Sequence, residues 1–172
     1  VLSFTAQEIW AELPGEREEF VFTGEWYKDI EAFTADTELG DEYWTQVLAI
    51  KEQVNRALEV AKKDKLVGAS LAAEVTLYVS DSLKSILETL GDELRLVLIT
   101  SVAKIAPMTD KPDSAFDSEL DGLFVSIAAS DAAKCDRCWH HSDTVGQHEA
   151  HPELCTRCVE NVDGEGEERK FA

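Results

Sequence analysis

Four cysteines near the end of the chain form two C-x-x-C pairs, Cys135 with Cys138 and Cys155 with Cys158, and the chain has no other cysteine. Sixteen residues separate the inner two. Each pair lets two thiolates reach one ion from a tight turn, and two pairs complete the tetrahedral four-sulfur shell of a structural zinc site. A closed shell leaves no open position for water. We therefore predict one zinc ion that organises the fold and hydrolyses nothing.

Other uses of four cysteines are two disulfides, two redox dithiols or a rubredoxin-like iron site. Disulfides are typical of secreted proteins, and we expect no secretion because no apolar signal segment is present. A redox dithiol usually occurs alone, beside a strand–helix unit. Iron remains an alternative because tetrahedral sulfur sites accept either metal. Nearby histidines that could compete as ligands are predicted to be surface residues: His140, His141, His148 and His151.

Basic residues lie beside the cysteines, whose four thiolates would carry four negative charges against the two positive charges of zinc. Lys134, Arg137 and Arg157 are expected to donate hydrogen bonds to sulfur. The chain as a whole has a formal charge of −19. This acidity argues against general electrostatic binding of nucleic acid. Any contact with nucleic acid is therefore expected to be local.

The elements that carry this module are predicted from hydrophobic periodicity and helix caps. Thr5-Ala-Gln-Glu8 is typical of a capping box, and the helix that it opens should end at Pro14-Gly15. Helical spacing of apolar residues predicts a long helix from Asp41 to Lys63. Alternation predicts a strand over 75–79. After it we expect a helix from Ser80 to Gly91, another helical turn, a strand near 97–105, a connection over 106–122 and a strand over 123–127.

Two groups of apolar residues are expected to pack in a core. One is the stripe on the long helix: Trp44, Val47, Leu48, Val54, Leu58 and Ala61. The other lies in the irregular segment over 15–40, where aromatic side chains are expected to pin a loop to a core: Phe20, Phe22, Trp26, Tyr27 and Phe33.

The order strand–helix–strand–strand within about sixty residues indicates a small α+β subdomain. The predicted fold is α+β in three parts: a helical segment over 1–66, a subdomain of about three strands over 67–133 and a four-cysteine zinc-ribbon or zinc-knuckle module over 134–172. No stretch reaches the length of a membrane span. The sequence has no G-x-G-x-x-G, P-loop, G-x-S-x-G or H-E-x-x-H motif, so no catalytic residue is assigned.

Several segments, taken in order, resemble bacterial isoleucyl-tRNA synthetase. Glu8–Gly15 and Val21–Trp26 resemble the end of the helical anticodon-binding domain in that family, which would make 1–66 part of an anticodon-binding bundle. Val54–Glu59 and Gly68–Glu74 resemble the segment that follows it. The C-terminus of the family is matched by Lys134–His140, Gly146, His148, His151, Leu154–Asn161, Gly164 and Arg169–Ala172.

The resemblance implies a class I aminoacyl-tRNA synthetase that ligates isoleucine to tRNA(Ile) with ATP and Mg²⁺. The catalytic and editing domains of the same polypeptide would lie upstream, and this chain would be an anticodon-side region without a catalytic site. A cytoplasmic monomer without membrane contact is implied. In this family, residues beside the second cysteine are implicated in anticodon contact, and they match Arg137 and Trp139. RNA loops are read by stacking of bases on aromatic and guanidinium planes, which suits both residue types.

Two of the site residues have a second interpretation. Trp139 could be a hydrophobic plug over the metal cluster. Arg157, in the same relative position of the second pair, either reaches the RNA backbone or covers sulfur.

Two other functions compete with tRNA recognition. A DNA-glycosylase-like zinc module has similar cysteine spacing but would need an N-terminal catalytic proline, and a protein-interaction zinc ribbon leaves the rest of the resemblance unexplained.

Overall fold

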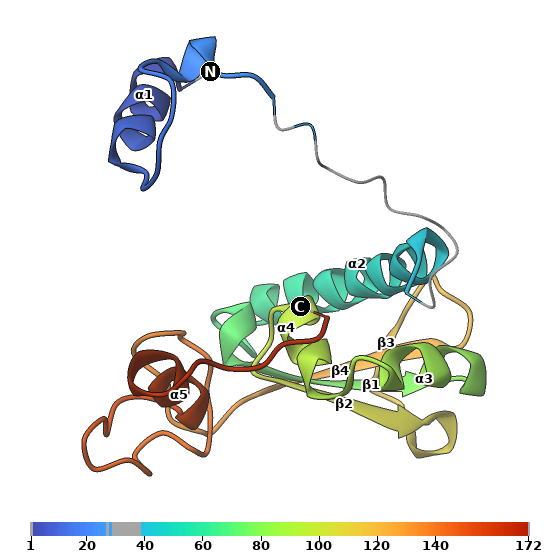
Figure 1. Ribbon diagram of the computed structural model, residues 1–172. Helices are drawn as coiled ribbons and strands as arrows, with labels where there is room; N and C mark the ends of the chain where they lie inside the picture. Colours follow the sequence, from blue (N-terminus) through green and yellow to red (C-terminus); the bar gives the residue numbers. More distant parts are fainter. Residues whose placement is uncertain (1, 27, 29–38, 172) are drawn as a thin grey trace. The chain divides into compact units, whose positions relative to one another are not determined.

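Helices and a four-stranded sheet make up the α+β fold that the sequence predicts (Figure 1). The computed structural model describes residues 2–26, 28 and 39–171. It divides the chain into two compact units, Val1–Thr34 and Ala35–Ala172. The predicted boundaries at 66 and 133 are not decided by this division and stay a prediction.

The first unit is built on helix α1 (Ser3–Glu12). Leu2 is its N-cap residue, and no side chain caps the helix. The predicted capping box at Thr5 is therefore wrong, because the helix has already begun two residues earlier. The chain then turns back along α1, since the indole N–H of Trp10 donates to the carbonyl oxygen of Glu18 at 2.8 Å.

The aromatic residues after α1 are exposed where the structure describes them. Phe22 lies in the 3₁₀ helix η1 (Val21–Thr23) and is 68% exposed, and Trp26 is 94% exposed. Phe20 is also exposed. The prediction that these three side chains pin a loop to a core is wrong within this unit. Tyr27 and Phe33 lie outside the described residues.

The second unit begins with the long helix α2 (Asp41–Lys63), whose predicted bounds are confirmed. Acidic residues in its first turn and lysines in its last turn suit the helix dipole. One predicted core residue is wrong: Leu48 is 54% exposed. Val47 lies toward one edge of the buried face, and Leu48, about 100° further around the helix, lies beyond that edge. The residues that this face buries are Val47, Ile50, Gln53, Val54, Ala57, Leu58 and Ala61.

The sheet has the strand order β2-β1-β4-β3. Strand β1 pairs in parallel with β2 and antiparallel with β4, and β3 pairs antiparallel with β4. The sequence predicted about three strands, and the fourth, β3, lies inside the predicted connection over 106–122. Two residues are too few to show a period of two. The strands are β1 (Ala73–Val79), β2 (Val102–Pro107), β3 (Phe116–Asp117) and β4 (Leu123–Ala129).

The segment between β1 and β2 is more helical than predicted. The apolar run that was expected to open a strand at residue 97 instead forms α4, whose buried Leu94 and Leu98 are one helical turn apart. Ile99 ends α4 in the left-handed conformation, with φ 58°. Short apolar runs do not separate strand from helix by pattern alone. The remaining elements are η2 (Ser70–Ala72), α3 (Asp81–Glu88), η3 (Gly91–Glu93), α4 (Leu94–Leu98), η4 (Met108–Asp110) and α5 (Thr156–Asp163).

One hydrophobic core joins α2, α3 and α4 to the sheet. Along β1, buried residues alternate with half-buried ones, so one face of the strand supplies the core. Leu77, which pairs with Ile105 of β2 and Val125 of β4, lies at its centre and is fully buried. Within the described part of the chain, no helix combines the length and the apolar character needed to cross a membrane.

Truncation of this core side chain should destabilise the second unit strongly. Leu77→Ala is expected to lower the free energy of unfolding by about 2–5 kcal/mol, because Leu77 is fully buried and its neighbours close only part of the cavity that the lost atoms leave. The matched control Leu48→Ala removes the same atoms from an exposed site and should change it by less than about 0.5 kcal/mol. Urea unfolding followed by circular dichroism measures both values. Equal effects would contradict the assigned core.

Candidate metal centre and nucleic-acid contact face

The four cysteine sulfurs lie together, with all Sγ atoms within 4.8 Å of one another. The Sγ atoms of Cys138 and Cys155 are 3.8 Å apart. Tetrahedral zinc with Zn–S bonds of about 2.3 Å places its sulfurs about 3.8 Å apart, so this spacing fits one ion. Cys135, Cys155 and Cys158 are buried, and no cysteine is joined in a disulfide. The cluster thus has the composition and the dimensions of a structural zinc site.

Two local turns bring the cysteine pairs together. In the first pair, the N–H of Trp139 donates to the carbonyl oxygen of Cys135 at 2.8 Å, closing a turn around the sulfurs. In the second, Cys155 is the N-cap residue of α5, and Cys158 lies in the first turn of that helix. The N–H of Cys155 donates to the Sγ of Cys135 at 3.3 Å, which joins the two turns.

The thiols differ in how readily they ionise. Burial raises the pKa of Cys155 to about 12. Burial also acts to raise the pKa of Cys135, but backbone N–H groups that include those of Cys138 and Cys155 outweigh it and lower that pKa to about 6. Four clustered thiolates, three of them buried, need a compensating cation. A divalent ion that binds sulfur supplies that charge when it is bound, which agrees with the donor set.

The three basic residues beside the cysteines have different surroundings. The guanidinium of Arg137 donates to the Sγ of Cys158 at 3.6 Å, as predicted for a residue that covers sulfur. Arg157 forms an ion pair with Glu167 at 3.0 Å and is largely buried. The ammonium of Lys134 lies 5.1 Å from the ring centroid of Trp139, so for this residue the structure shows a cation–π contact in place of the predicted bond to sulfur.

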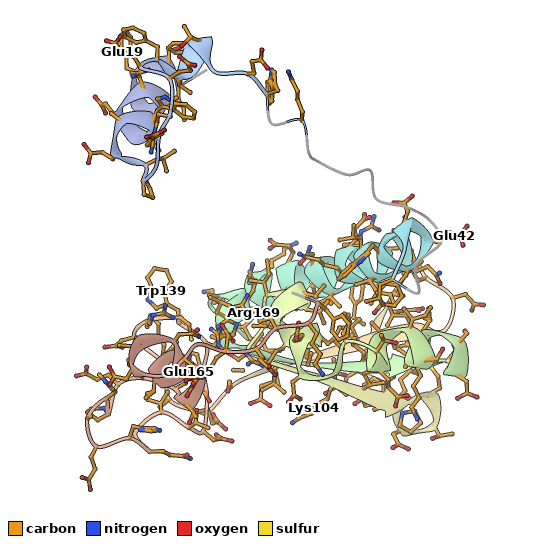
Figure 2. The ribbon with its side chains drawn as sticks, in the orientation of Figure 1. Glu19, Glu42, Lys104, Trp139, Glu165 and Arg169 are labelled. Carbon is orange, nitrogen blue, oxygen red and sulfur yellow. The ribbon has the colours of Figure 1, made fainter. Side chains whose placement is uncertain are left out.

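Trp139 stands out from the metal cluster. Its side chain is 60% exposed, and Figure 2 shows the ring projecting from the ribbon at the edge of the cysteine module. This exposure does not agree with a plug over the cluster. Its backbone has φ 64°, in the left-handed region that bulky residues avoid. A strained position of this kind is a reason to look for a function of the side chain.

None of the four histidines is part of the sulfur cluster. His141 contacts the carbonyl oxygen of Ala132 through Nδ1 at 2.8 Å, and His151 pairs with Asp163. His148 is exposed, as predicted. His140 corrects the prediction of surface histidines: both of its ring nitrogens are buried and have no hydrogen-bond partner among the described residues. Burial lowers the pKa of His140, and the charges of Arg95 and Arg157 lower it further.

Ser101 connects the cysteine module to the sheet, a role that was not predicted from the sequence. Its Oγ accepts a hydrogen bond from the N–H of His141 at 2.6 Å and donates one to the carbonyl oxygen of Leu71. Next to this contact is a cavity of about 590 Å³ between β2 and the module, lined in part by Glu74, Arg95 and the cysteine module. A serine before a strand gives no signal in sequence that it will bind a residue forty positions later.

Removal of this hydroxyl should destabilise the contact between module and sheet. Ser101→Ala leaves the N–H of His141 without its acceptor, so we expect the free energy of unfolding to fall by about 1–3 kcal/mol. The exposed Ser114 offers a matched control, and Ser114→Ala should have little effect. Chemical denaturation followed by circular dichroism compares the two variants. If Ser101→Ala changed the free energy of unfolding no more than Ser114→Ala does, the contact would not stabilise the attachment of the module to the sheet.

Comparison with known proteins identifies relatives of both the module and the whole chain. Residues 133–161 match a family described as "Zinc finger found in FPG and IleRS". Over all 172 residues, the chain is 56% identical to an isoleucine--tRNA ligase of Aliivibrio fischeri. It is 52% identical, also over all 172 residues, to isoleucine--tRNA ligases of Vibrio atlanticus and Shewanella sediminis. These similarities confirm the resemblance to bacterial isoleucyl-tRNA synthetase that the sequence segments indicated.

The chain spans 18% of the length of each of these relatives. It is similar along its whole length to one segment of isoleucine--tRNA ligases, and the similarity extends beyond the matched zinc-finger residues at 133–161 on both sides.

Proposed function

We propose that this chain is a segment of an isoleucine--tRNA ligase and recognises tRNA(Ile) on the anticodon side. The observation that carries the proposal is the similarity to isoleucine--tRNA ligases at 56% identity over all 172 residues. A zinc-finger match alone would support only a four-cysteine module, because its description covers two kinds of protein.

The chemistry of ligation is assigned to parts of the ligase outside this chain. ATP, Mg²⁺ and isoleucine would bind in a catalytic domain, and the present segment would contribute no catalytic residue. Its partners would be tRNA(Ile) and the catalytic and editing domains of the same polypeptide. The ligase is proposed to act as a monomer in the cytoplasm.

Zinc is proposed to be held by Cys135, Cys138, Cys155 and Cys158 and to supply structural order. With the backbone fixed by the metal, the ring of Trp139 is held outward at a small cost in conformational entropy. An unstacked anticodon base can then lie against this ring, since single-stranded RNA is read by such stacking. Lys134, beside the ring, adds a positive charge close to the RNA backbone.

Arg137 and Arg157 also stay proposed tRNA contacts. The bond from Arg137 to Cys158 and the ion pair between Arg157 and Glu167 favour a role in holding the cluster, in which each arginine offsets thiolate charge. We therefore rank Trp139 first among the residues that face RNA. Trp139 ranks above Arg157 because Trp139 is 60% exposed and Arg157 is largely buried. Arg137 is also exposed, and it ranks below Trp139 because its guanidinium donates to the Sγ of Cys158.

Electrostatics limit how this segment binds RNA by itself. A formal charge of −19 repels the phosphate backbone, and phosphate contacts supply much of the affinity in most protein–nucleic acid complexes. The segment is therefore proposed to contribute local base contacts, and other parts of the ligase to contribute phosphate contacts. The full-length ligase is the form in which to measure binding.

A titration tests the proposal. Full-length ligase is titrated with tRNA(Ile) and with the same tRNA carrying a different anticodon, and tryptophan fluorescence reports binding. We expect tighter binding of tRNA(Ile), with the difference located at the anticodon. Equal affinities for the two tRNAs would remove anticodon recognition and would leave a protein-interaction zinc module as the better interpretation.

A DNA-glycosylase-like function is the second candidate because the matched family description includes FPG. That match covers 29 of the 172 residues, since it runs from 133 to 161. The similarity to isoleucine--tRNA ligases covers all of them. The first function is therefore preferred. Binding of duplex DNA that competes with tRNA(Ile) would favour the second.

A further inference from the structure

The last residues of the chain return to the sheet subdomain. After α5 ends at Asp163, residues 164–171 run back beside α4, as the red end of the ribbon in Figure 1 shows. We call residues 164–171 the C-terminal strap. Its sequence is charged. In the structure it makes specific contacts at both ends.

At its first end the strap is bonded to α5. The carboxylate of Glu167 accepts hydrogen bonds from Arg157 and from the side-chain amide of Asn161, both at 3.0 Å. The N–H of Glu167 donates to Oδ1 of Asn161 at 3.1 Å. Arg157 lies between Cys155 and Cys158. This end of the strap is therefore attached to the helix that carries the second cysteine pair.

At its other end the strap is bonded to η3. The N–H groups of Lys170 and Phe171 donate to the two carboxylate oxygens of Glu93, each at 2.7 Å. Hydrogen bonds to an ionised group are about twice as strong as neutral ones. The ring of Phe171 also packs against the hydrophobic core formed by the helices and the sheet. The strap therefore connects the cysteine module to the main core through both polar and apolar contacts.

Such a connection matters because the two parts have separate cores. The apolar residues around the four cysteines form one cluster, and those of the helices and sheet form another. The contact of Ser101 with His141 attaches the module at one point. A body attached at one point can pivot in any direction, and a second attachment restricts this motion to rotation about the line that joins the two points. Figure 2 shows Arg169, in the strap, between the cysteine module and the helices.

We propose that the C-terminal strap fixes the orientation of the zinc module on the sheet subdomain and that Glu93, Glu167 and Phe171 are positioning residues for the RNA contact of Trp139. The RNA part of this inference rests on the proposed function. The inference that the strap orients the module on the sheet subdomain does not depend on that function. Stacking on one ring requires that ring at a defined place and angle, so a module that pivots loses affinity while its metal site stays intact.

The test uses Glu93→Ala and Phe171→Ala in the full-length ligase. Asp92→Ala and Glu168→Ala are matched controls, since each removes an exposed carboxylate next to a strap contact. Three properties are measured: zinc per chain, hydrogen–deuterium exchange of residues 134–163 and of 73–79, and the Kd for tRNA(Ile). Phe171→Leu, which keeps an apolar anchor, should behave closer to the parent than Phe171→Ala.

For Glu93→Ala and Phe171→Ala we expect unchanged zinc, faster exchange over 134–163, unchanged exchange over 73–79 and a Kd raised about 2- to 30-fold, the range for changes that act through a contact network. Unchanged exchange over 134–163 would overturn the proposed role of the strap in orienting the module. So would loss of zinc or faster exchange over 73–79, because the residues would then support folding and not orientation. If the parent ligase does not distinguish tRNA(Ile) by its anticodon, the proposed function fails, and the exchange data still decide on the strap.

Discussion

Cys135→Ser is expected to remove stoichiometric zinc and to unfold residues 134–163, while the sheet subdomain stays folded. Cys135 is fully buried, and its Sγ accepts the N–H of Cys155, so both turns depend on it. The free energy of zinc binding in a structural site is about 10–16 kcal/mol and is spent on folding the module. The other core does not depend on the metal, because its residues form a separate cluster.

Elemental analysis and hydrogen–deuterium exchange measure this outcome. The parent should contain about one zinc per chain, since four thiolates fill one tetrahedral shell. Incubation with a strong chelator should reproduce the exchange pattern of Cys135→Ser. The matched control is His148→Ala, which changes an exposed residue near the cysteines and should keep its zinc. One equivalent of iron in the parent, or cysteines oxidised to disulfides without metal, would show that the zinc assignment is wrong.

Trp139→Ala should weaken binding of tRNA(Ile) by full-length ligase by about 5- to 150-fold, which corresponds to the roughly 1–3 kcal/mol of one base stacked on an aromatic ring. The ring is available for stacking because it is 60% exposed and is contacted by Lys134 on one side. The formation of isoleucyl-adenylate, which does not need tRNA, should stay nearly unchanged. Equilibrium binding and the adenylate assay give the two values.

Two further variants separate the ring from the backbone. Trp139→Phe keeps an aromatic face and should retain part of the affinity. Trp139→Gly removes the ring, so it should lose RNA affinity. Glycine adopts the left-handed backbone at φ 64° without strain, so this variant should keep its zinc and its stability. Loss of zinc in Trp139→Ala would instead indicate a structural role.

The sequence was sufficient for features that depend on local spacing. The two C-x-x-C pairs predicted the sulfur cluster: a turn of four residues brings the two sulfurs of each pair together, and two such pairs complete the shell of one ion. The 23 residues of α2 were predicted with correct bounds. The acidic Asp41 stands at its first position and Lys62 and Lys63 at its end. The error at Leu48 came from a stripe drawn too wide for the face that the sheet covers.

Features that depend on distant residues were not predictable in this way. Strand β3 exists only because β4 offers a free edge, and its two residues show no pattern. The bonds of Ser101 to His141 and of Glu93 to Phe171 join residues 40 and 78 positions apart. For Arg157, spacing alone could not decide between RNA and sulfur, because its partner Glu167 lies beyond the second cysteine pair. Only the tertiary fold specifies these partners.

The central claim is that the zinc module presents Trp139 to the anticodon. It is tested most directly by the affinities of the parent ligase and of Trp139→Ala for two tRNAs, tRNA(Ile) and the same tRNA with its anticodon replaced. The four values form a double-mutant cycle, in which coupling measures a direct interaction. We predict that the preference of the parent for tRNA(Ile) falls sharply in Trp139→Ala, because the lost contact is the one proposed to be made to the anticodon. An unchanged preference, with both tRNAs weakened equally or not at all, would contradict the account.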